Sequence, residues 1–417
     1  MGTFEPIAEP PENLVTTSLP LSQRAGAMPA SPIRRLAPYA VAARKRGLVV
    51  HGLNIGQPDI PTPQAILDRL HQFALPYVAY GPSQGLPEFQ DALRQYYAGV
   101  GVTLSVEEIF VTTAGSEAIQ FTLGALCDAG DQVLVFEPFY TNYSGFAAMM
   151  GVDVVSVTTH GEDGYHLPDR AAIEARIGPR TRAILICSPN NPTGTVYTEA
   201  EIELLASIAT QRGLYLVADE VYREFVYDGG TSRSVLTLPG LEQHVIVVDS
   251  VSKRYSLCGA RIGNIVSRNR AFMEAILRFG QARLCPPTIE QLACCALTEV
   301  PPSYAASVLA EYQQRRNVVH AALTQLPGVQ VRRPEGAFYM CPRLPIDDGN
   351  AFAIFLLEEF SLDGETLMMA PLDGFYGTPG LGRDEVRIAY VLEQAKLTRA
   401  MRILGAGLTA YAERAKV

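Results

Sequence analysis

The chain has 417 residues, 48% of them hydrophobic, which is enough for about two or three domains with a sizeable core. Lys and Arg number 34 against 43 Asp and Glu, and this net charge of -9 argues against nucleic-acid binding, which needs a clustered basic face. There is no apolar stretch of about 18 residues and no basic leader followed by an apolar run, so the sequence predicts a cytoplasmic protein without a membrane partner.

The cysteines and histidines predict neither a disulfide framework nor a metal site. The seven cysteines are odd in number and lie mostly inside apolar runs such as residues 184–187, ILIC. The six histidines have no second ligand at metal spacing. We therefore expect reduced cysteines that pack in the core, and no bound metal.

The first 60 residues predict an arm and a docking segment. Residues 1–27 are rich in Pro, Glu, Ser and Thr, which is typical of a flexible N-terminal arm. Ser31 followed by Pro32 predicts a helix that begins there and runs to Gly47. We expect residues 28–60 to dock on a smaller domain.

From residue 61 to 300, amphipathic helices alternate with short runs of β-branched residues. Buried runs between helices predict a large α/β domain whose mostly parallel, seven-stranded sheet is covered by helices on both faces. The predicted strands are Ile109–Thr112, Gln132–Phe136, Val152–Val157, Ala183–Cys187, Tyr215–Ala218, Val245–Val248 and Ile262–Val266. Residues 301–417 mix helices and strands, which favours a smaller α+β domain.

Lys253 follows the apolar strand Val245–Val248 and is set among small residues. Ligands of open α/β sheets lie at the carboxyl ends of the strands, where this lysine would be. Burial away from water disfavours the charged ammonium form of a lysine, and the neutral amine can then attack a carbonyl. Ser250, Ser252 and Arg261 add hydroxyls and a fixed cation that suit a phosphate.

Three other segments carry groups for the same chemistry. After the strand ending at Thr112, a helix start frees the backbone N–H groups of three residues to bind an anion; these are Gly115, Ser116 and Glu117. Asn191, in SPNNPTG at 188–194, can donate to a phenolate-like oxygen. Asp219 and Tyr222, in VADEVY at 217–222, follow another strand. A buried carboxylate needs a partner such as a protonated heterocyclic nitrogen.

As an ordered set, Asn191, Asp219, Tyr222, Lys253 and Arg261 resemble the class I/II aminotransferases of fold type I, which use pyridoxal 5'-phosphate. The resemblance covers about residues 31–405, and NIGQPDIPTP at 54–63 is similar to the bacterial aspartate or broad-range branch. It implies that Lys253 joins the cofactor covalently and moves a proton as base and acid, that Asp219 pairs with the ring nitrogen, and that Asn191 and Tyr222 contact the ring hydroxyl oxygen.

The resemblance also assigns further residues. It implies that Tyr140 stacks on the cofactor, that Ser250, Ser252, Arg261 and the amides of residues 115–117 hold the phosphate, and that Tyr80 reaches a phosphate across a homodimer interface. Shared active sites are therefore expected. For the substrate, it implies an α-carboxylate clamp at Arg387, closure by the backbone of Gly56, and contact with Asn191. We expect Arg283, or a residue near Ser31 to Arg35, to bind the distal group.

The implied reaction is ping-pong transfer of an amino group from an L-amino acid, aspartate or broad-range and aromatic, to a 2-oxo acid such as 2-oxoglutarate. Other outcomes of the same cofactor chemistry stay open at this point. They are a lyase of the aminocyclopropane-carboxylate-synthase type, a decarboxylase, an amino-acid oxidase, and a catalytically silent cofactor-binding regulator.

Overall fold

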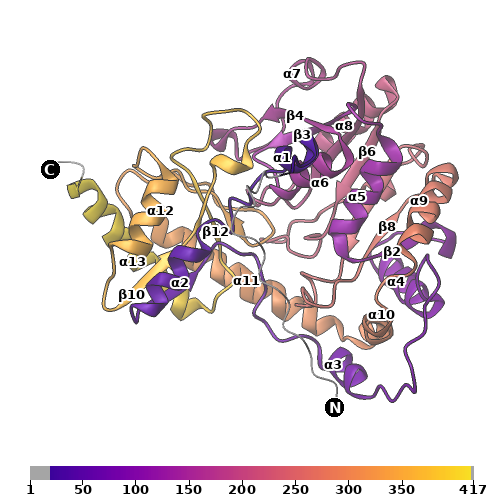
Figure 1. Cartoon of the computed structure of the whole chain (residues 1–417), viewed down its shortest axis with the longest axis horizontal. Coiled ribbons are helices and arrows are strands. Elements are labelled where there is room, and N and C mark those ends of the chain that lie inside the picture. Colours follow the sequence, from indigo (N-terminus) through magenta and orange to yellow (C-terminus); the bar gives the residue numbers. More distant parts are fainter. Residues whose placement is uncertain (1–18, 415–417) are drawn as a thin grey trace, which may run out of the picture.

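The computed structural model describes residues 19–414 as a helix-covered sheet on one side and a smaller α/β unit on the other (Figure 1). The seven strands of the large sheet have the order β2-β8-β7-β6-β5-β3-β4. Their bounds are β2 (Ile109–Thr112), β3 (Gln132–Glu137), β4 (Asp153–Thr158), β5 (Thr181–Cys187), β6 (Tyr215–Asp219), β7 (Val245–Ser250) and β8 (Gly263–Val266). Only β8 runs antiparallel to its neighbours, β2 and β7, so the predicted mostly parallel sheet is confirmed.

Alternate residues of the central strands enter two different cores. In β3, Val133 and Val135 face one cluster of buried side chains, whereas Leu134 and Phe136 face the other. Because both faces are covered, the strands are continuous apolar runs rather than alternating ones. The helices of this part are α3 (Gln64–His71), α4 (Pro87–Gly99), α5 (Ala114–Leu126), α6 (Asn142–Met150), α7 (Arg170–Glu174), α8 (Glu199–Arg212), α9 (Arg270–Arg283) and α10 (Thr288–Cys294).

The smaller unit combines a segment from the N-terminal part of the described chain with its C-terminal part. Its elements are α2 (Ala37–Lys45), β1 (Val49–Gly52), α11 (Pro302–Leu323), β9 (Tyr339–Met340), α12 (Gly349–Glu358), β10 (Glu365–Met368), β11 (Ala370–Pro371), β12 (Val386–Ala389) and α13 (Gln394–Arg414). β1 pairs in parallel with β10, and Leu36 and Ala40 share a core with Leu357. α11 runs between the two parts (Figure 1). The division of the chain at residues 60 and 300 stays a prediction.

The predicted helix start at Ser31 is wrong. Residues 32–36 form turns, and the helix α2 begins at Ala37. Pro38 has no N–H to donate to the oxygen of Arg34, so a regular helical ladder cannot run through this point, and Ala37 N closes a tighter turn on Arg34 O at 2.9 Å. Of the predicted arm, residues 1–18 lie outside the described residues, and the short helix α1 (Gln23–Ala27) buries none of its side chains.

Within residues 19–414, no single helix has the length and apolar character needed to cross a membrane. One bent pair of segments, Thr288–Glu299 and Pro302–Leu323, meets those two criteria when taken together.

Candidate active site

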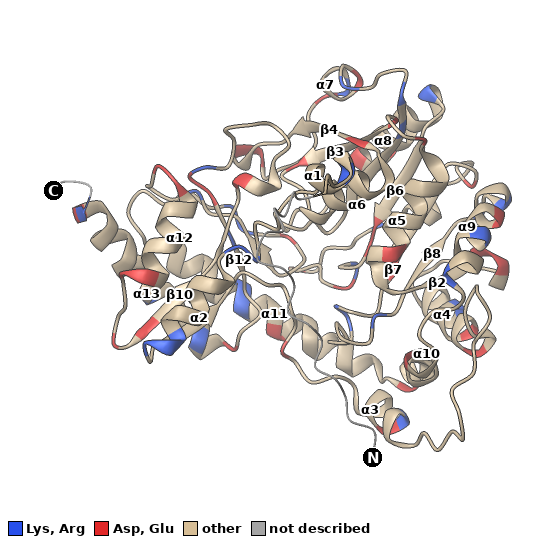
Figure 2. Ribbon diagram, viewed as in Figure 1, with Lys and Arg blue, Asp and Glu red and all other residues tan. Residues whose placement is uncertain are grey.

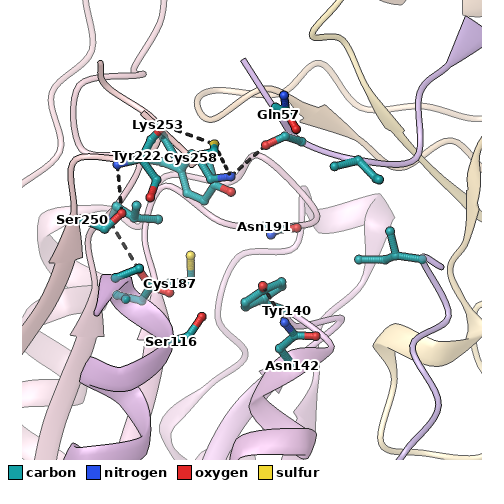
Figure 3. A pocket seen from close by; sticks show the side chains of 18 of the residues that line it. Gln57, Ser116, Tyr140, Asn142, Cys187, Asn191, Tyr222, Ser250, Lys253 and Cys258 are labelled. Atoms are coloured by element: carbon teal, nitrogen blue, oxygen red, sulfur yellow. Dashed lines mark hydrogen bonds between the residues drawn. The ribbon is translucent and has the colours of Figure 1, made fainter. Parts of the chain in front are cut away.

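A cavity of about 460 Å³ lies between the sheet and the smaller unit. Its floor comes from the carboxyl ends of strands β5, β6 and β7, and its other side from the loop 55–57, β9 and β12 (Figure 3). The structure brings twelve predicted site residues to this one cavity, which are Gly56, Gly115, Ser116, Tyr140, Asn191, Asp219, Tyr222, Ser250, Ser252, Lys253, Arg261 and Arg387. Strands far apart in sequence thus place their terminal side chains around one space, as open α/β sheets do.

Lys253 reaches into the cavity from the loop after β7. Its Nζ donates a hydrogen bond of 2.8 Å to the backbone oxygen of Gly56 and lies 3.7 Å from Cys258 Sγ (Figure 3). Burial lowers the pKa of the Lys253 ammonium, against an opposing effect of Cys258, and the positive charges of Arg387 and Arg261 lower it further. A lysine in this setting gives up its proton more readily than an exposed one, as a nucleophile and general base requires.

Asp219 ends strand β6 and is nearly inaccessible to solvent. Its Oδ2 accepts a hydrogen bond of 2.8 Å from the Tyr143 hydroxyl, and its Oδ1 accepts a longer one of 3.3 Å from the N–H of Val221. Burial raises the pKa of the carboxyl to about 6, and these two hydrogen bonds only partly offset that effect. A cationic group placed in the cavity would give this carboxylate the partner that it lacks within the described residues.

An anion seat forms where the first turn of α5 meets the end of β7. Gly115 and Ser116 line the cavity there beside the buried side chains of Ser250 and Ser252. The approach is close because Gly263, at the start of β8, has no side chain: a Cβ at that position would lie 2.5 Å from the carbonyl carbon of Ala114. Free N–H groups of a helix start and two hydroxyls are the groups that bind a phosphate.

Arg261 completes this seat with a positive charge. Its backbone is left-handed, with φ +56°, and its Nη1 donates a hydrogen bond of 2.7 Å to Cys258 O. The strained conformation turns the side chain toward the cavity, which it lines.

Arg387 is buried in β12 on the opposite side of the cavity. Its Nη1 donates to Asn191 Oδ1 at 2.9 Å and its Nη2 donates to Asn54 O, while the guanidinium lies over the rings of Tyr339 and Phe375. The Nε atom of Arg387 is buried and makes no hydrogen bond within residues 19–414. With its oxygen turned to Arg387, Asn191 keeps its NH₂ group free to donate.

Three predicted residues do not put side chains into the cavity. The carboxylate of Glu117 turns back to accept a hydrogen bond of 2.7 Å from Thr113 N, so only its backbone amide remains a candidate. Arg283 donates to that same carboxylate at 2.6 Å and to Ser83 O at 2.9 Å, and it does not line the cavity. Tyr80 is 81% exposed in the single chain.

The structure adds residues that the sequence did not single out. Tyr339 lines the cavity, and its hydroxyl lies 2.7 Å from that of Tyr222. Tyr143 holds Asp219, and Cys258 adjoins Lys253. Tyr339 falls in the region 301–417, for which the sequence predicted only a mixture of helices and strands, and the one available signal for Tyr143 was a second aromatic residue just after Tyr140.

Charge on the outer helices is mixed. In the view of Figure 2, basic and acidic residues are interspersed over the described part of the chain without a continuous basic face. No group of three or more His, Cys, Asp or Glu side chains within residues 19–414 could hold a metal ion.

Comparison with known proteins gives the same result over almost the whole chain. The family model "Aminotransferase class I and II" matches residues 49–404. The "Aspartate/prephenate aminotransferase" of Thermus thermophilus is 31% identical, over 92% of this chain and 99% of its own length. "Aromatic-amino-acid aminotransferase 2" of Thermococcus litoralis is 30% identical, over 91% of this chain and 96% of its own.

A solved structure, "Thermus thermophilus aspartate aminotransferase single mutant 1", superposes with a TM-score of 0.85 and 30% identity, covering 93% of this chain and 100% of that one. The fold, the cavity and these matches together show that the chain belongs to the class I and II aminotransferases, enzymes that use pyridoxal phosphate to move an amino group between an amino acid and a 2-oxo acid.

Proposed function

We propose that the chain is an aminotransferase of the aspartate or broad-range type that passes the amino group to a 2-oxo acid such as 2-oxoglutarate and acts as a cytoplasmic homodimer. One observation carries the proposal. A partly buried lysine of lowered pKa, a buried carboxylate of raised pKa and a buried arginine whose Nε has no hydrogen-bond partner within residues 19–414 line the same cavity, and these are Lys253, Asp219 and Arg387. The names of the relatives support the aspartate and aromatic substrate range.

The residues of the cavity fit pyridoxal phosphate. Asp219 suits the protonated ring nitrogen because its burial leaves it in need of a cation. The α5 start, Ser250, Ser252 and Arg261 suit the phosphate, and Tyr140 offers a ring face beside them. When bound, the cofactor supplies an electron sink for negative charge at the α-carbon of the substrate.

Lys253 is the group we assign to proton transfer. Its Nζ would take a proton from the α-carbon of the substrate and return one to the cofactor carbon that receives the amino group, because burial makes the ammonium form give up its proton more readily. The Gly56 oxygen accepts from Nζ and limits where the amine points. Tyr222 and the NH₂ group of Asn191 are assigned to the ring hydroxyl oxygen.

Arg387 is the group we assign to the α-carboxylate of the substrate. A planar guanidinium can donate two parallel hydrogen bonds to a carboxylate, and its present partners, Asn191 Oδ1 and Asn54 O, are neutral oxygens that a charged ligand can outcompete. The two aromatic rings that cover the guanidinium exclude water from it, which strengthens its interaction with a carboxylate.

The dimer proposal is supported by an exposed, aromatic stretch. Tyr77, Val78 and Tyr80 are 75%, 57% and 81% exposed in the single chain, which is unusual for adjacent large apolar side chains. We assign Tyr80 to the phosphate in the partner's cavity. The cytoplasmic proposal is in keeping with seven cysteines that are all free thiols.

The half-reaction tests the chemistry. The purified enzyme, loaded with cofactor, is mixed with one amino acid at a time while the visible spectrum is recorded. We expect one half-turnover that stalls until a 2-oxo acid is added. Continued release of product from the amino acid alone would instead identify a lyase, a decarboxylase or an oxidase. Loss of a borohydride-stable cofactor adduct in Lys253→Ala is the control, and an adduct that persists in this variant would contradict the role of the lysine.

Complementation tests the shared sites. Lys253→Ala and Tyr80→Ala are each expected to be nearly inactive as homodimers. A mixed dimer should regain one working site, because one cavity then has both a normal lysine and a normal partner tyrosine. If the mixed sample is no more active than the two variant homodimers together, the active sites are not shared between subunits.

A further inference from the structure

Arg34 is a partly solvent-exposed arginine that lines the cavity and has no partner among the described residues. It belongs to the turn before α2 and lines the same cavity as Lys253 and Arg387. Within residues 19–414, its guanidinium takes part in no hydrogen bond and no ion pair, whereas the adjacent Arg35 is bound to Asn350 and, at 2.8 Å, to Asp373. The two neighbouring arginines therefore have different roles. Arg35 holds the segment in place, whereas Arg34 faces the cavity.

The backbone that carries Arg34 is held firmly. Pro32 is buried, and a Cβ on Gly374 would lie 2.6 Å from the Pro32 ring, so the two are in close contact. On the next residue, Ile33 O accepts a hydrogen bond of 3.0 Å from Asn54 Nδ2. The backbone oxygen of Asn54 in turn accepts from Arg387. One residue thus fixes the Arg34 segment relative to the arginine assigned to the α-carboxylate.

The charges around the cavity leave Arg34 without a counterion. Among residues 19–414, the basic lining residues are Arg34, Lys253, Arg261 and Arg387, and the one acidic lining residue is Asp219. In the proposed function, Arg261 faces the phosphate, Arg387 faces the α-carboxylate, and Asp219 faces the ring nitrogen. A substrate with a single carboxylate would leave the charge of Arg34 unmatched, whereas a second carboxylate on the substrate would match it.

The position of Arg34 also agrees with its effect on Tyr140. Burial raises the pKa of the Tyr140 phenol, and the positive charges of Arg387 and Arg34 act in the opposite direction. Both arginines are therefore near enough to the same ring to influence it. Arg283, the other arginine considered for this role, already faces a carboxylate, that of Glu117.

We propose that Arg34 binds the side-chain carboxylate of a dicarboxylic amino acid or 2-oxo acid, so that one subunit supplies the arginines for both carboxylates of the substrate. The inference rests on the proposed function and specifies its substrate class. A guanidinium on a fixed backbone can receive the distal carboxylate by rotating its own side chain, without movement of the smaller unit.

Equilibrium binding of unreactive acids tests the inference without turnover. Succinate and butyrate have the same chain length and differ in the second carboxylate, and their dissociation constants are measured by titrating the cofactor-loaded enzyme. We expect Arg34→Gln to weaken succinate binding by about 10- to 100-fold relative to butyrate. Arg34→Lys keeps the positive charge but loses the planar guanidinium with its paired N–H donors, so this variant should retain part of the preference for succinate over butyrate. The matched control is Arg44→Gln, which removes an exposed arginine of α2 that does not line the cavity and should keep the ratio of the two constants.

Turnover separates this inference from the proposed function. The ratio of kcat/KM for aspartate to that for phenylalanine should fall in Arg34→Gln by a factor similar to the change in the binding ratio. If the unaltered enzyme transaminates no amino acid, the proposed function fails. If it transaminates but prefers succinate no more than butyrate, or if Arg34→Gln weakens both acids equally, Arg34 is not the distal-carboxylate residue and only this inference is overturned.

Discussion

Lys253 Nζ donates a hydrogen bond of 2.8 Å to the backbone oxygen of Gly56, a residue 197 positions away in the sequence. The bond joins the loop after β7 to the N-terminal segment that pairs with the smaller unit. The approach depends on glycine, because a Cβ at position 56 would lie 1.8 Å from the hydroxyl of Tyr339. Three segments that are distant in sequence therefore meet at the amine assigned to catalysis.

Gly56→Ala is expected to lower kcat/KM by about 100-fold, since a new methyl group must displace either the 55–57 loop or Tyr339 by more than an ångström. Displacing Tyr339 also breaks its contact with the Tyr222 hydroxyl. Steady-state kinetics with the best amino acid measures the effect. Gly52→Ala is the control, because the nearest atom to its added Cβ would be 3.8 Å away. Activity in Gly56→Ala equal to that of the control would contradict the steric argument.

The large sheet could be predicted from the sequence because its signal is local. Each strand is a short run of β-branched residues between helices, and a sheet buried on both faces needs such continuous runs. All seven predicted strands occur in the sheet, with small shifts at their ends. The helix start at Ser31 failed because two proline signals compete there, and Pro38 is the one that lies in the first turn of α2.

The motif residues of the site were also predictable, but their surroundings were not. Tyr143 lies 76 residues before Asp219, and Tyr339 lies 117 residues after Tyr222, so no local pattern connects these pairs. The pairing of Glu117 with Arg283 spans 166 residues and takes both side chains away from the cavity. Such contacts arise only when packing of the whole fold brings the elements together.

Arg283→Ala is expected to reduce aspartate and phenylalanine turnover by the same factor. The substitution leaves the carboxylate of Glu117, which is 14% exposed, without its cation, and this should destabilise the protein by about 2 kcal/mol. The disturbance falls on the first turn of α5, which both substrates depend on equally. Parallel kcat/KM measurements and denaturant unfolding test it, and a loss confined to aspartate would restore Arg283 as a selectivity residue.

Asp219→Asn is expected to stabilise the cofactor-free protein at high pH. The folded pKa of Asp219 is raised to about 6 from 3.8, so the folded state binds a proton more readily than the unfolded state. The loss of folding stability caused by burying the ionised carboxylate is therefore absent below pH 3.8 and fully present above pH 6. It amounts to about 3 kcal/mol at pH 8 and roughly half of that at pH 5.

Unfolding of the cofactor-free protein in denaturant at pH 8 and pH 5 measures this difference. Asp228→Asn is the matched control, and this variant should be less stable than the parent. The Arg316 guanidinium lowers the pKa of Asp228, so the ionised Asp228 carboxylate stabilises the fold above the unfolded pKa. An Asp219→Asn protein no more stable than the parent at pH 8 would contradict the burial argument.

His166→Gln is expected to destabilise the protein more at pH 6 than at pH 9.5. The ring of His166 lies between Glu201, at 3.0 Å, and Glu335, at 3.3 Å, and these carboxylates, Glu201 foremost, raise its pKa to about 10 from 6.5. Because the folded pKa is the higher one, the stabilisation is complete below pH 6.5 and is lost as pH rises through about 10. The ring is partly exposed, so we expect only about 1 kcal/mol at pH 6.

Thermal unfolding of the His166→Gln protein at the two pH values gives the readout. His320 provides the matched control, because burial lowers its pKa, so its charge destabilises the fold and the pH trend of His320→Gln should be reversed. Since Glu335 is followed within four residues by Tyr339, the same substitution should also raise KM by loosening one wall of the cavity. A Tm deficit equal at both pH values would mean that His166 contributes by packing rather than by its charge.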